Sequence, residues 1–220
     1  MKRNVLFFVL FAGFVFSVFG QNVSDFRYIE SNSGIVITGY TGSVKDVRIP
    51  ERINGLPVVG IGGGVFIGGD FDWFIGSAFV EKQLTSITLP NSLIYIGDGA
   101  FLGNQLTSIT FPNSLIHIGA GAFGGNQLTS ITLPNSLTYI GAGAFGENQL
   151  TSITLPDSLT YIGDEAFCEN QLTSITFPNS LTYIGRYAFF ENQLTNVVIP
   201  NSVVNLHPNA FDSNVRIIRR

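Results

Sequence analysis

The chain contains very little cysteine and histidine. Among its 220 residues there is one cysteine, Cys168, and there are two histidines, His117 and His207. A single cysteine can neither close an intrachain disulfide nor build a cysteine-based zinc site. Cys168 is therefore an unpaired thiol, one half of an intermolecular bridge, or a neutral substitution at a variable exterior position. The sequence predicts no metal site and no cofactor.

Positive charge is scarce as well. No lysine or arginine occurs between Lys82 and Arg186. Loss of Lys2 and Arg3 with an N-terminal export signal would leave nine basic residues against 15 acidic ones, a net charge of about −6. Binding to a phosphate backbone requires a basic stripe, so the composition excludes nucleic acid as the expected partner.

Residues arranged for catalysis are also missing. His117 occupies a position at which other parts of the chain carry tyrosine, and Ser92 recurs at an equivalent turn along the chain. The glycine-rich segment 60–64 lacks the lysine and the following helix of a phosphate-binding loop. The sequence therefore predicts a protein that is not an enzyme.

What the chain does contain is a 22-residue repeat. Five close copies begin at Gln83, Gln105, Gln127, Gln149 and Gln171, and a more diverged sixth begins at Gln193 and ends at Asn214. A fixed period of this length is typical of a solenoid. Seven positions of each copy are apolar, and one copy cannot bury them alone, so the core must run as a continuous stripe along the stack. In the first copy these positions are Leu84, Ile87, Leu89, Leu93, Ile96, Ala100 and Phe101.

Each copy has the pattern of a short strand followed by a turn. Ile87 and Leu89 alternate with Ser86 and Thr88, which predicts that the first pair points inward and the second pair outward. Pro90 cannot donate to a sheet ladder and ends the strand. The segment 93–96 then returns across the core, and Ala100 with Phe101 closes the coil.

The pattern Leu-x-x-Ile-x-Leu-Pro-x-x-Leu-x-x-Ile-Gly-x-x-Ala-Phe resembles the BspA-type leucine-rich repeat, which is found mostly in bacterial surface and secreted proteins. The resemblance covers about residues 34–214. Asparagines such as Asn104 stand where the family often has cysteine, and the coil is one residue shorter than usual. The resemblance implies an α/β-type repeat solenoid that is mostly β, with parallel strands stacked along one face, 22-residue coils and little regular helix.

The rest of the chain divides around this repeat. Lys2 and Arg3 precede an apolar run, so residues 1–20 are predicted to be a cleaved signal peptide that directs the protein to the cell surface, the medium or the periplasm. Residues 21–43 are expected to form N-terminal capping strands, and 44–82 a diverged first coil with an aromatic insertion. The six repeats occupy 83–214, and 215–220 is expected to add a C-terminal capping strand or tail. No later apolar run is long enough to span a membrane.

Two surfaces are candidates for binding. The first is a ladder of hydroxyls on the strand face, with good β-propensity and solubility as the alternative explanation. Its residues are Thr85, Ser86, Thr88, Thr107, Ser108, Thr110, Thr129, Ser130, Thr132, Thr151, Ser152, Thr154, Thr173, Ser174 and Thr176. The second is the insertion, in which Phe71, Trp73 and Phe74 form a ligand anchor or pack on the core as part of a half-coil.

The sequence thus predicts a secreted or cell-surface leucine-rich repeat protein that acts as a non-catalytic interaction or adhesion module. By resemblance, its partner is a protein or glycan, including host or extracellular matrix molecules. The rival prediction is a structural repeat of the bacterial envelope that self-associates into a surface coat. A third, ice binding by flat threonine rows, predicts thermal hysteresis.

Overall fold

The computed structural model describes residues 22–62, 65–67, 70–72 and 77–220, and the side chains between 63 and 76 are left undescribed. The predicted export signal therefore lies outside the described residues, as do Trp73 and Phe74. Within the described part of the chain, no helix has the length and apolar character needed to cross a membrane.

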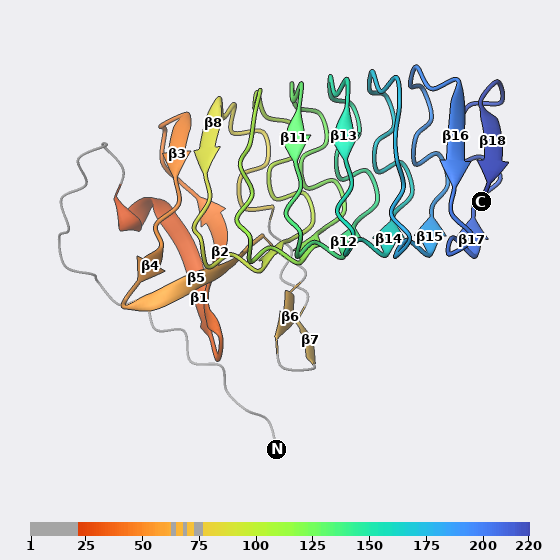
Figure 1. Ribbon diagram of the computed structural model, residues 1–220. Coiled ribbons are helices and arrows are strands. Elements are labelled where there is room, and N and C mark those ends of the chain that lie inside the picture. The colour runs from red at the N-terminus through yellow and green to blue at the C-terminus, as the bar shows by residue number, and fades with distance from the viewer. Residues whose placement is uncertain (1–21, 63–64, 68–69, 73–76) are drawn as a thin grey trace.

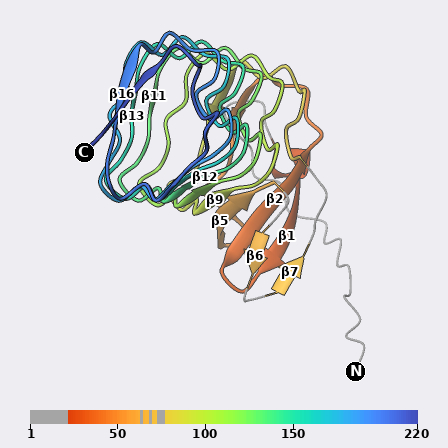
Figure 2. The same ribbon diagram turned by 90° about the vertical axis from the view of Figure 1, so that its right-hand side faces the viewer.

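The chain winds into a mostly-β solenoid whose coils follow one another along a single axis (Figure 1). A short 3₁₀ helix, Val23–Asp25, is the single helical element among the described residues. The view along the stack shows successive coils superposed, with the N-terminal strands projecting beyond them (Figure 2). The predicted fold class is confirmed, because parallel pairing repeats with the same register from coil to coil.

One side of the solenoid carries a ten-stranded sheet. It begins with the antiparallel hairpin of β1 (Phe26–Ser31) and β2 (Gly34–Tyr40), and β2 then pairs in parallel with β5 (Leu56–Ile61). The short strand β4 (Arg52–Ile53) pairs antiparallel with β5. The remaining strands each contribute one tyrosine-isoleucine step or its equivalent. These are β9 (Tyr95–Ile96), β10 (His117–Ile118), β12 (Tyr139–Ile140), β14 (Tyr161–Ile162), β15 (Tyr183–Ile184) and β17 (Asn205–Leu206).

The opposite side carries shorter, interrupted ladders built from the Ser-Ile-Thr segments. Strand β3 (Asp46–Arg48) pairs with β8 (Ser86–Thr88), β11 (Ile131–Thr132) with β13 (Ile153–Thr154), and β16 (Asn196–Ile199) with β18 (Arg216–Arg219). All three pairs are parallel. The sequence predicted strands here but did not predict that the continuous sheet lies on the other side.

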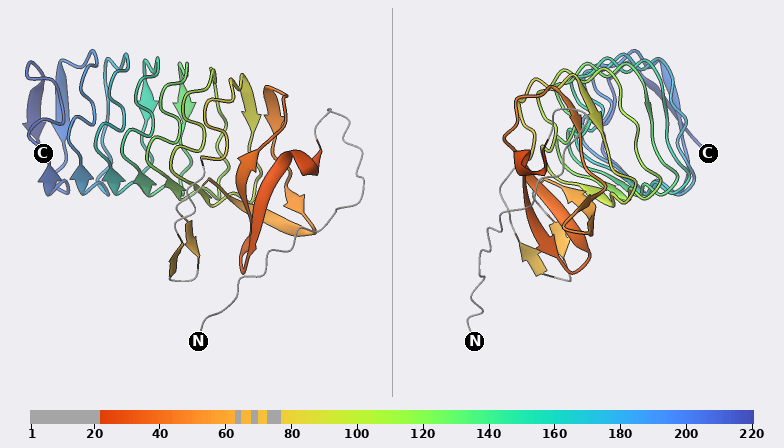
Figure 3. Two further views of the ribbon diagram at one scale, coloured as in Figure 1. Left: turned by 180° about the vertical axis from the view of Figure 1, so that it is seen from behind. Right: turned by 90° about the vertical axis from the view of Figure 1, so that its left-hand side faces the viewer.

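A separate antiparallel hairpin leaves the stack after the first coil. It consists of β6 (Val65–Ile67) and β7 (Asp70–Asp72), with Phe66 opposite Phe71. Figures 1 and 3 show this hairpin extending beyond the coils on the side of the ten-stranded sheet. Of the predicted aromatic anchor, only Phe71 thus lies within a described strand.

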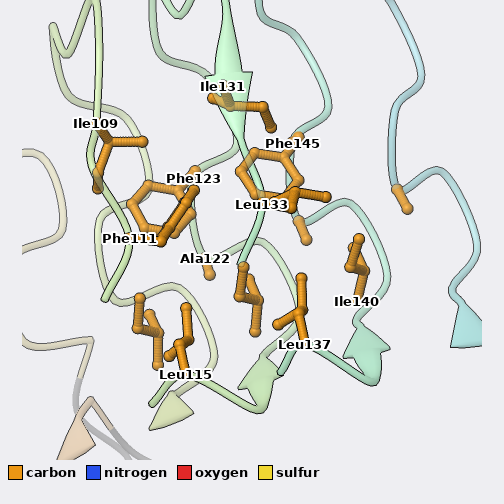
Figure 4. Packing of buried hydrophobic residues seen from close by; sticks show 14 of the residues in the cluster. Ile109, Phe111, Leu115, Ala122, Phe123, Ile131, Leu133, Leu137, Ile140 and Phe145 are labelled. Carbon is orange, nitrogen blue, oxygen red and sulfur yellow. The ribbon is translucent and has the colours of Figure 1, made fainter. Parts of the chain in front are cut away.

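Phenylalanine rings form the spine of the core. Neighbouring rings from Phe79 to Phe211 stack with centroids 5.1 to 5.5 Å apart and planes tilted by at most 17°. Tyr40 from the N-terminal hairpin stacks on Phe79 at 5.3 Å and covers the first ring. Figure 4 shows Phe123 and Phe145 among the leucine and isoleucine side chains that complete the core. The hairpin therefore covers the N-terminal end of the phenylalanine row.

A row of buried asparagines holds the coils together at the closing turn. Asn148 donates from Nδ2 to the carbonyl oxygens of Phe123, Phe145 and Gly146, and its Oδ1 accepts the N–H of Leu128 at 3.0 Å. Asn104, Asn126, Asn170 and Asn192 make the same contacts one or more coils away. Since one side chain bonds backbone groups of two successive coils, it joins each coil to its neighbour.

Candidate functional site

The predicted hydroxyl ladder lies on one face of the stack. Of its fifteen residues fourteen are exposed, and Ser86 is half-buried. Thr110, Thr132 and Thr154 occupy equivalent places in successive coils, here called a column, and their backbones pair in parallel. Positions with the same spacing bring the serines and the other threonines into parallel columns. The structure thus assembles the residues that the sequence singled out into one surface.

Most hydroxyls of this face are available to a partner. Thr85 donates to the carbonyl of Lys45, and Ser86 donates to the carboxylate of Asp46. For the other thirteen, no side-chain hydrogen bond is made to any residue that the structure describes. The serines of the proline turn differ, because Ser136 and Ser158 donate to the carbonyls of Leu115 and Leu137 at 2.6 Å. The turn serines therefore stabilise the stack, whereas those thirteen ladder hydroxyls face outward and are available for hydrogen bonds with a partner.

The face is also free of charge over its middle coils. The segments 83–89, 105–111, 127–133, 149–155 and 171–177 contain glutamine, threonine, serine and apolar residues only. Exposed glutamine amides at the start of each segment extend the hydroxyl columns. The arrangement offers repeated hydrogen-bond donors and acceptors to a partner, and none of these side chains is charged at neutral pH.

The sequence missed an aromatic ladder on the ten-stranded sheet. His117, Tyr139, Tyr161 and Tyr183 stack along the sheet with ring centroids 4.4 to 4.6 Å apart and planes within 7° of parallel. All four side chains are half-buried. The recurrence of tyrosine at a fixed place in each copy was visible in the sequence, but it served there only to classify His117. Because the ring faces cover one another, the ladder presents mainly ring edges to solvent.

Burial shifts the pKa of three members of this ladder toward the uncharged form. It raises the pKa of Tyr161 to about 12, with smaller contributions from Tyr139 and Tyr183. Burial also lowers the pKa of His117, although the nearby Asp98 opposes the shift. Tyr95 belongs to the same column but lies over Gly60, where any Cβ would collide with its ring. Its buried hydroxyl has no hydrogen-bond partner among the described residues, and burial raises its pKa.

The remaining candidates for chemistry are isolated from one another. His117 and His207 lie in different coils, and no cluster of three histidine, cysteine, aspartate or glutamate side chains in the described part of the chain is arranged to hold a metal ion. Cys168 is half-buried, and burial, with Glu169 and Glu165 beside it, raises the pKa of its thiol to about 11. A thiol held protonated in this way is a poor nucleophile.

The last strand at the C-terminal end of the stack, β18, carries arginine side chains. Strand β18 pairs with β16 so that Arg219 lies opposite Ile199, in the column that is otherwise apolar and points into the core. Arg219 is exposed, and its Nη1 donates to the carbonyl of Val203 at 2.9 Å. An inward-pointing charge on an edge strand hinders the addition of another strand.

Comparison with known proteins agrees with this architecture. A leucine-rich repeat protein of T. pallidum is similar over 78% of this chain and 88% of its own, with 27% identity and a TM-score of 0.55. A leucine-rich repeat protein of Bacteroides ovatus covers 91% of this chain and 67% of its own at 20% identity, with a TM-score of 0.46. A search of curated protein sequences gives no match.

The family comparison is more direct. The profile described as the BspA type leucine rich repeat region matches six copies, over residues 75–169 and 138–219. Leucine-rich repeat proteins are in general protein-interaction modules built on non-enzymatic scaffolds. The chain belongs to the BspA-type leucine-rich repeat family.

Proposed function

We propose that this protein is exported to the cell surface or beyond it and serves there as a non-catalytic adhesion module that binds a protein partner through the hydroxyl ladder. The observation that carries the proposal is the exposed, uncharged face of thirteen hydroxyls that have no hydrogen-bond partner among the described residues. The apolar run after Lys2 and Arg3 supports export. Extracellular matrix proteins are the proposed partners.

Repetition compensates for the weakness of each contact. Serine and threonine are under-represented among the residues that dominate interface energies, so a single hydroxyl contributes little. Five equivalent coils present the same groups in the same register, and linked weak contacts reinforce one another when they engage simultaneously. The partner is therefore expected to lie along several coils.

The edges of the stack favour this function over a self-associating coat. Growth of the stack by addition of another copy would place a strand beside β18. Arg216 and Arg219 are exposed on that strand, and Arg219 occupies the inward column. The antiparallel β1–β2 hairpin occupies the other end of the ten-stranded sheet. Both ends thus oppose end-to-end growth.

Binding and oligomeric state must be measured together. The purified protein is tested against immobilised extracellular matrix proteins and glycans by biolayer interferometry, and its mass in solution is determined by light scattering. The proposal predicts saturable binding by a monomer. Absence of binding to the whole panel, combined with concentration-dependent growth in mass, would instead establish the coat.

A further inference from the structure

A shallow depression of about 290 Å³ opens on the hydroxyl ladder between the third and fourth repeats. Thr132 and Thr154 contribute hydroxyls to it, and Asn135 and Asp157 contribute an amide and a carboxylate from the following turns. Leu133 and Leu155 also line it, and each is 6% exposed. The depression thus combines an apolar floor with polar walls.

The location of the depression coincides with a change of residue type at one position of the repeat. The column that contains Leu133 and Leu155 carries phenylalanine in the coils on either side, at Phe111 and Phe177. The third and fourth repeats are therefore the one neighbouring pair of repeats in which both members have the smaller leucine at this position. These two repeats also pair through β11 and β13, whereas the equivalent segment before Phe177 forms no strand.

A second departure from the repeat coincides with the first. Asp157 is the one acid in a column that is otherwise asparagine, at Asn91, Asn113, Asn135, Asn179 and Asn201. Its side chain is exposed, and no residue in the described part of the chain donates a hydrogen bond to it or pairs with it. The repeats are otherwise nearly identical, and the one repeat with a carboxylate at this position is also one of the two that line the depression.

We infer that this depression receives a lysine or arginine side chain of the protein partner, with the charged head on Asp157 and the aliphatic stem on Leu133 and Leu155. Long basic side chains characteristically lay their methylene stems on apolar surface while the head stays at a polar group. Charge-assisted hydrogen bonds to a carboxylate are stronger than neutral ones. The hydroxyls of Thr132 and Thr154 lie beside the stem, where they can bond the partner backbone. The inference rests on the proposed function, because it describes where the partner meets the ladder.

The test uses a lysine peptide as the probe. The isotope-labelled protein is titrated with acetyl-Gly-Lys-Gly-amide, followed by amide resonances in two-dimensional NMR, and then with the same peptide carrying norleucine, which keeps the stem without the charge. The lysine peptide is expected to shift the amides of Thr132, Thr154 and Asp157, and the norleucine peptide to bind more weakly. Added salt should weaken the lysine peptide only.

The decisive variants move the carboxylate. Asp157→Asn gives the residue that the other five copies carry, so the coil should fold unchanged. Its affinity for the lysine peptide is expected to fall by about three- to five-fold, as for a solvent-exposed ion pair. The double variant Asp157→Asn with Asn179→Asp restores the net charge but places it beside Phe177, and its affinity should stay low. Equal affinity of the native protein and either variant would overturn the inference.

Three further outcomes separate this inference from the proposed function. If a neutral oligosaccharide shifts the same amides and Asp157→Asn leaves that binding intact while the lysine peptide shifts none, the depression is a glycan site and the inference fails. If matrix-protein binding requires the ladder but does not respond to Asp157→Asn, the inference fails and the proposed function stands. If no matrix protein binds the ladder, the proposed function fails whatever the peptide does.

Discussion

The closing asparagine of each coil shows how single residues hold the stack. Asn148 is 7% exposed, yet all of its polar atoms have backbone partners. The sequence revealed its recurrence but not its burial, because an asparagine at a turn is also a common surface residue. Only the stacking of two successive coils brings the backbone groups that it bonds within reach.

Replacing Asn148 by alanine should therefore be costly. The Leu128 N–H loses its hydrogen-bond partner. The carbonyl oxygens of Phe123, Phe145 and Gly146 each lose one donor and keep another, from Asn126, Asn170 and the Gly125 N–H. One unsatisfied buried donor predicts a loss of about 1 to 3 kcal/mol in the free energy of unfolding, measured by chemical denaturation. The neighbouring Gln149→Ala removes an exposed side chain and should change stability by less than about 0.5 kcal/mol. Similar effects of the two variants would contradict this role for Asn148.

Glu165 is expected to be under backbone strain. Its φ is +58°, in the left-handed region, and the equivalent residues Gly99, Gly121 and Gly143 have φ between +59° and +61°. Glu165→Gly should raise the free energy of unfolding by about 0.5 to 1 kcal/mol, because glycine adopts this conformation without a Cβ penalty. Glu165→Ala keeps the penalty while removing the charge. An equal gain in the alanine variant would assign the effect to charge instead.

At the scale of elements, the repeat period predicted the solenoid, whereas the alternation of apolar and polar residues did not predict which segments form strands. The inward places of Ile131 and Leu133 and the outward place of Thr132 follow from alternation, and the structure agrees. Strand formation itself depends on packing between coils. The segments before Phe111 and Phe177 form at most an isolated bridge, although they carry the same Ser-Ile-Thr pattern as β11 and β13. Both phenylalanine rings meet the spine edge-on, a contact between distant residues that one copy cannot reveal.

The aromatic ladder gives the sheet a characteristic pH dependence. The pKa of Tyr161 is raised in the fold from 10.0 to about 12, and that of Tyr139 is raised as well. The unfolded chain therefore loses these protons first, so these two tyrosines should leave stability unchanged below about pH 10 and should lower it as the pH rises from 10 to 12. Denaturation midpoints across this range test the prediction. The variant with phenylalanine at 139, 161 and 183 keeps the rings and should lose less stability, whereas an unchanged slope would contradict the assignment.

At the scale of the molecule, the two ends of the solenoid differ from its middle. The sequence predicted caps at both ends, and the antiparallel β1–β2 hairpin and the arginine-bearing β18 occupy those places. The sequence could not place Arg219 in the inward column, because β18 pairs with β16 at a spacing of 20 residues and not at the 22-residue period.

Removal of these charges should allow the molecules to associate. Arg216→Thr combined with Arg219→Leu removes both charges from β18 and makes both of its inward places apolar, so its open edge should pair with a strand of another copy. Light scattering should then show mass increasing with concentration. Arg186→Thr changes charge away from this edge and should leave the mass unchanged. A double variant that stays monomeric at high concentration would refute the capping role.

The measurement that tests the account most directly compares two sets of three lysines. Lysines at Thr110, Thr132 and Thr154 disrupt the hydroxyl ladder. Lysines at Thr138, Thr160 and Thr182, which immediately precede β12, β14 and β15, add the same charge beside the ten-stranded sheet. Biolayer interferometry against a matrix protein that binds the native chain should show binding lost in the first variant and retained in the second. Loss in the second variant alone would place the binding surface on the sheet with the aromatic ladder and contradict the account.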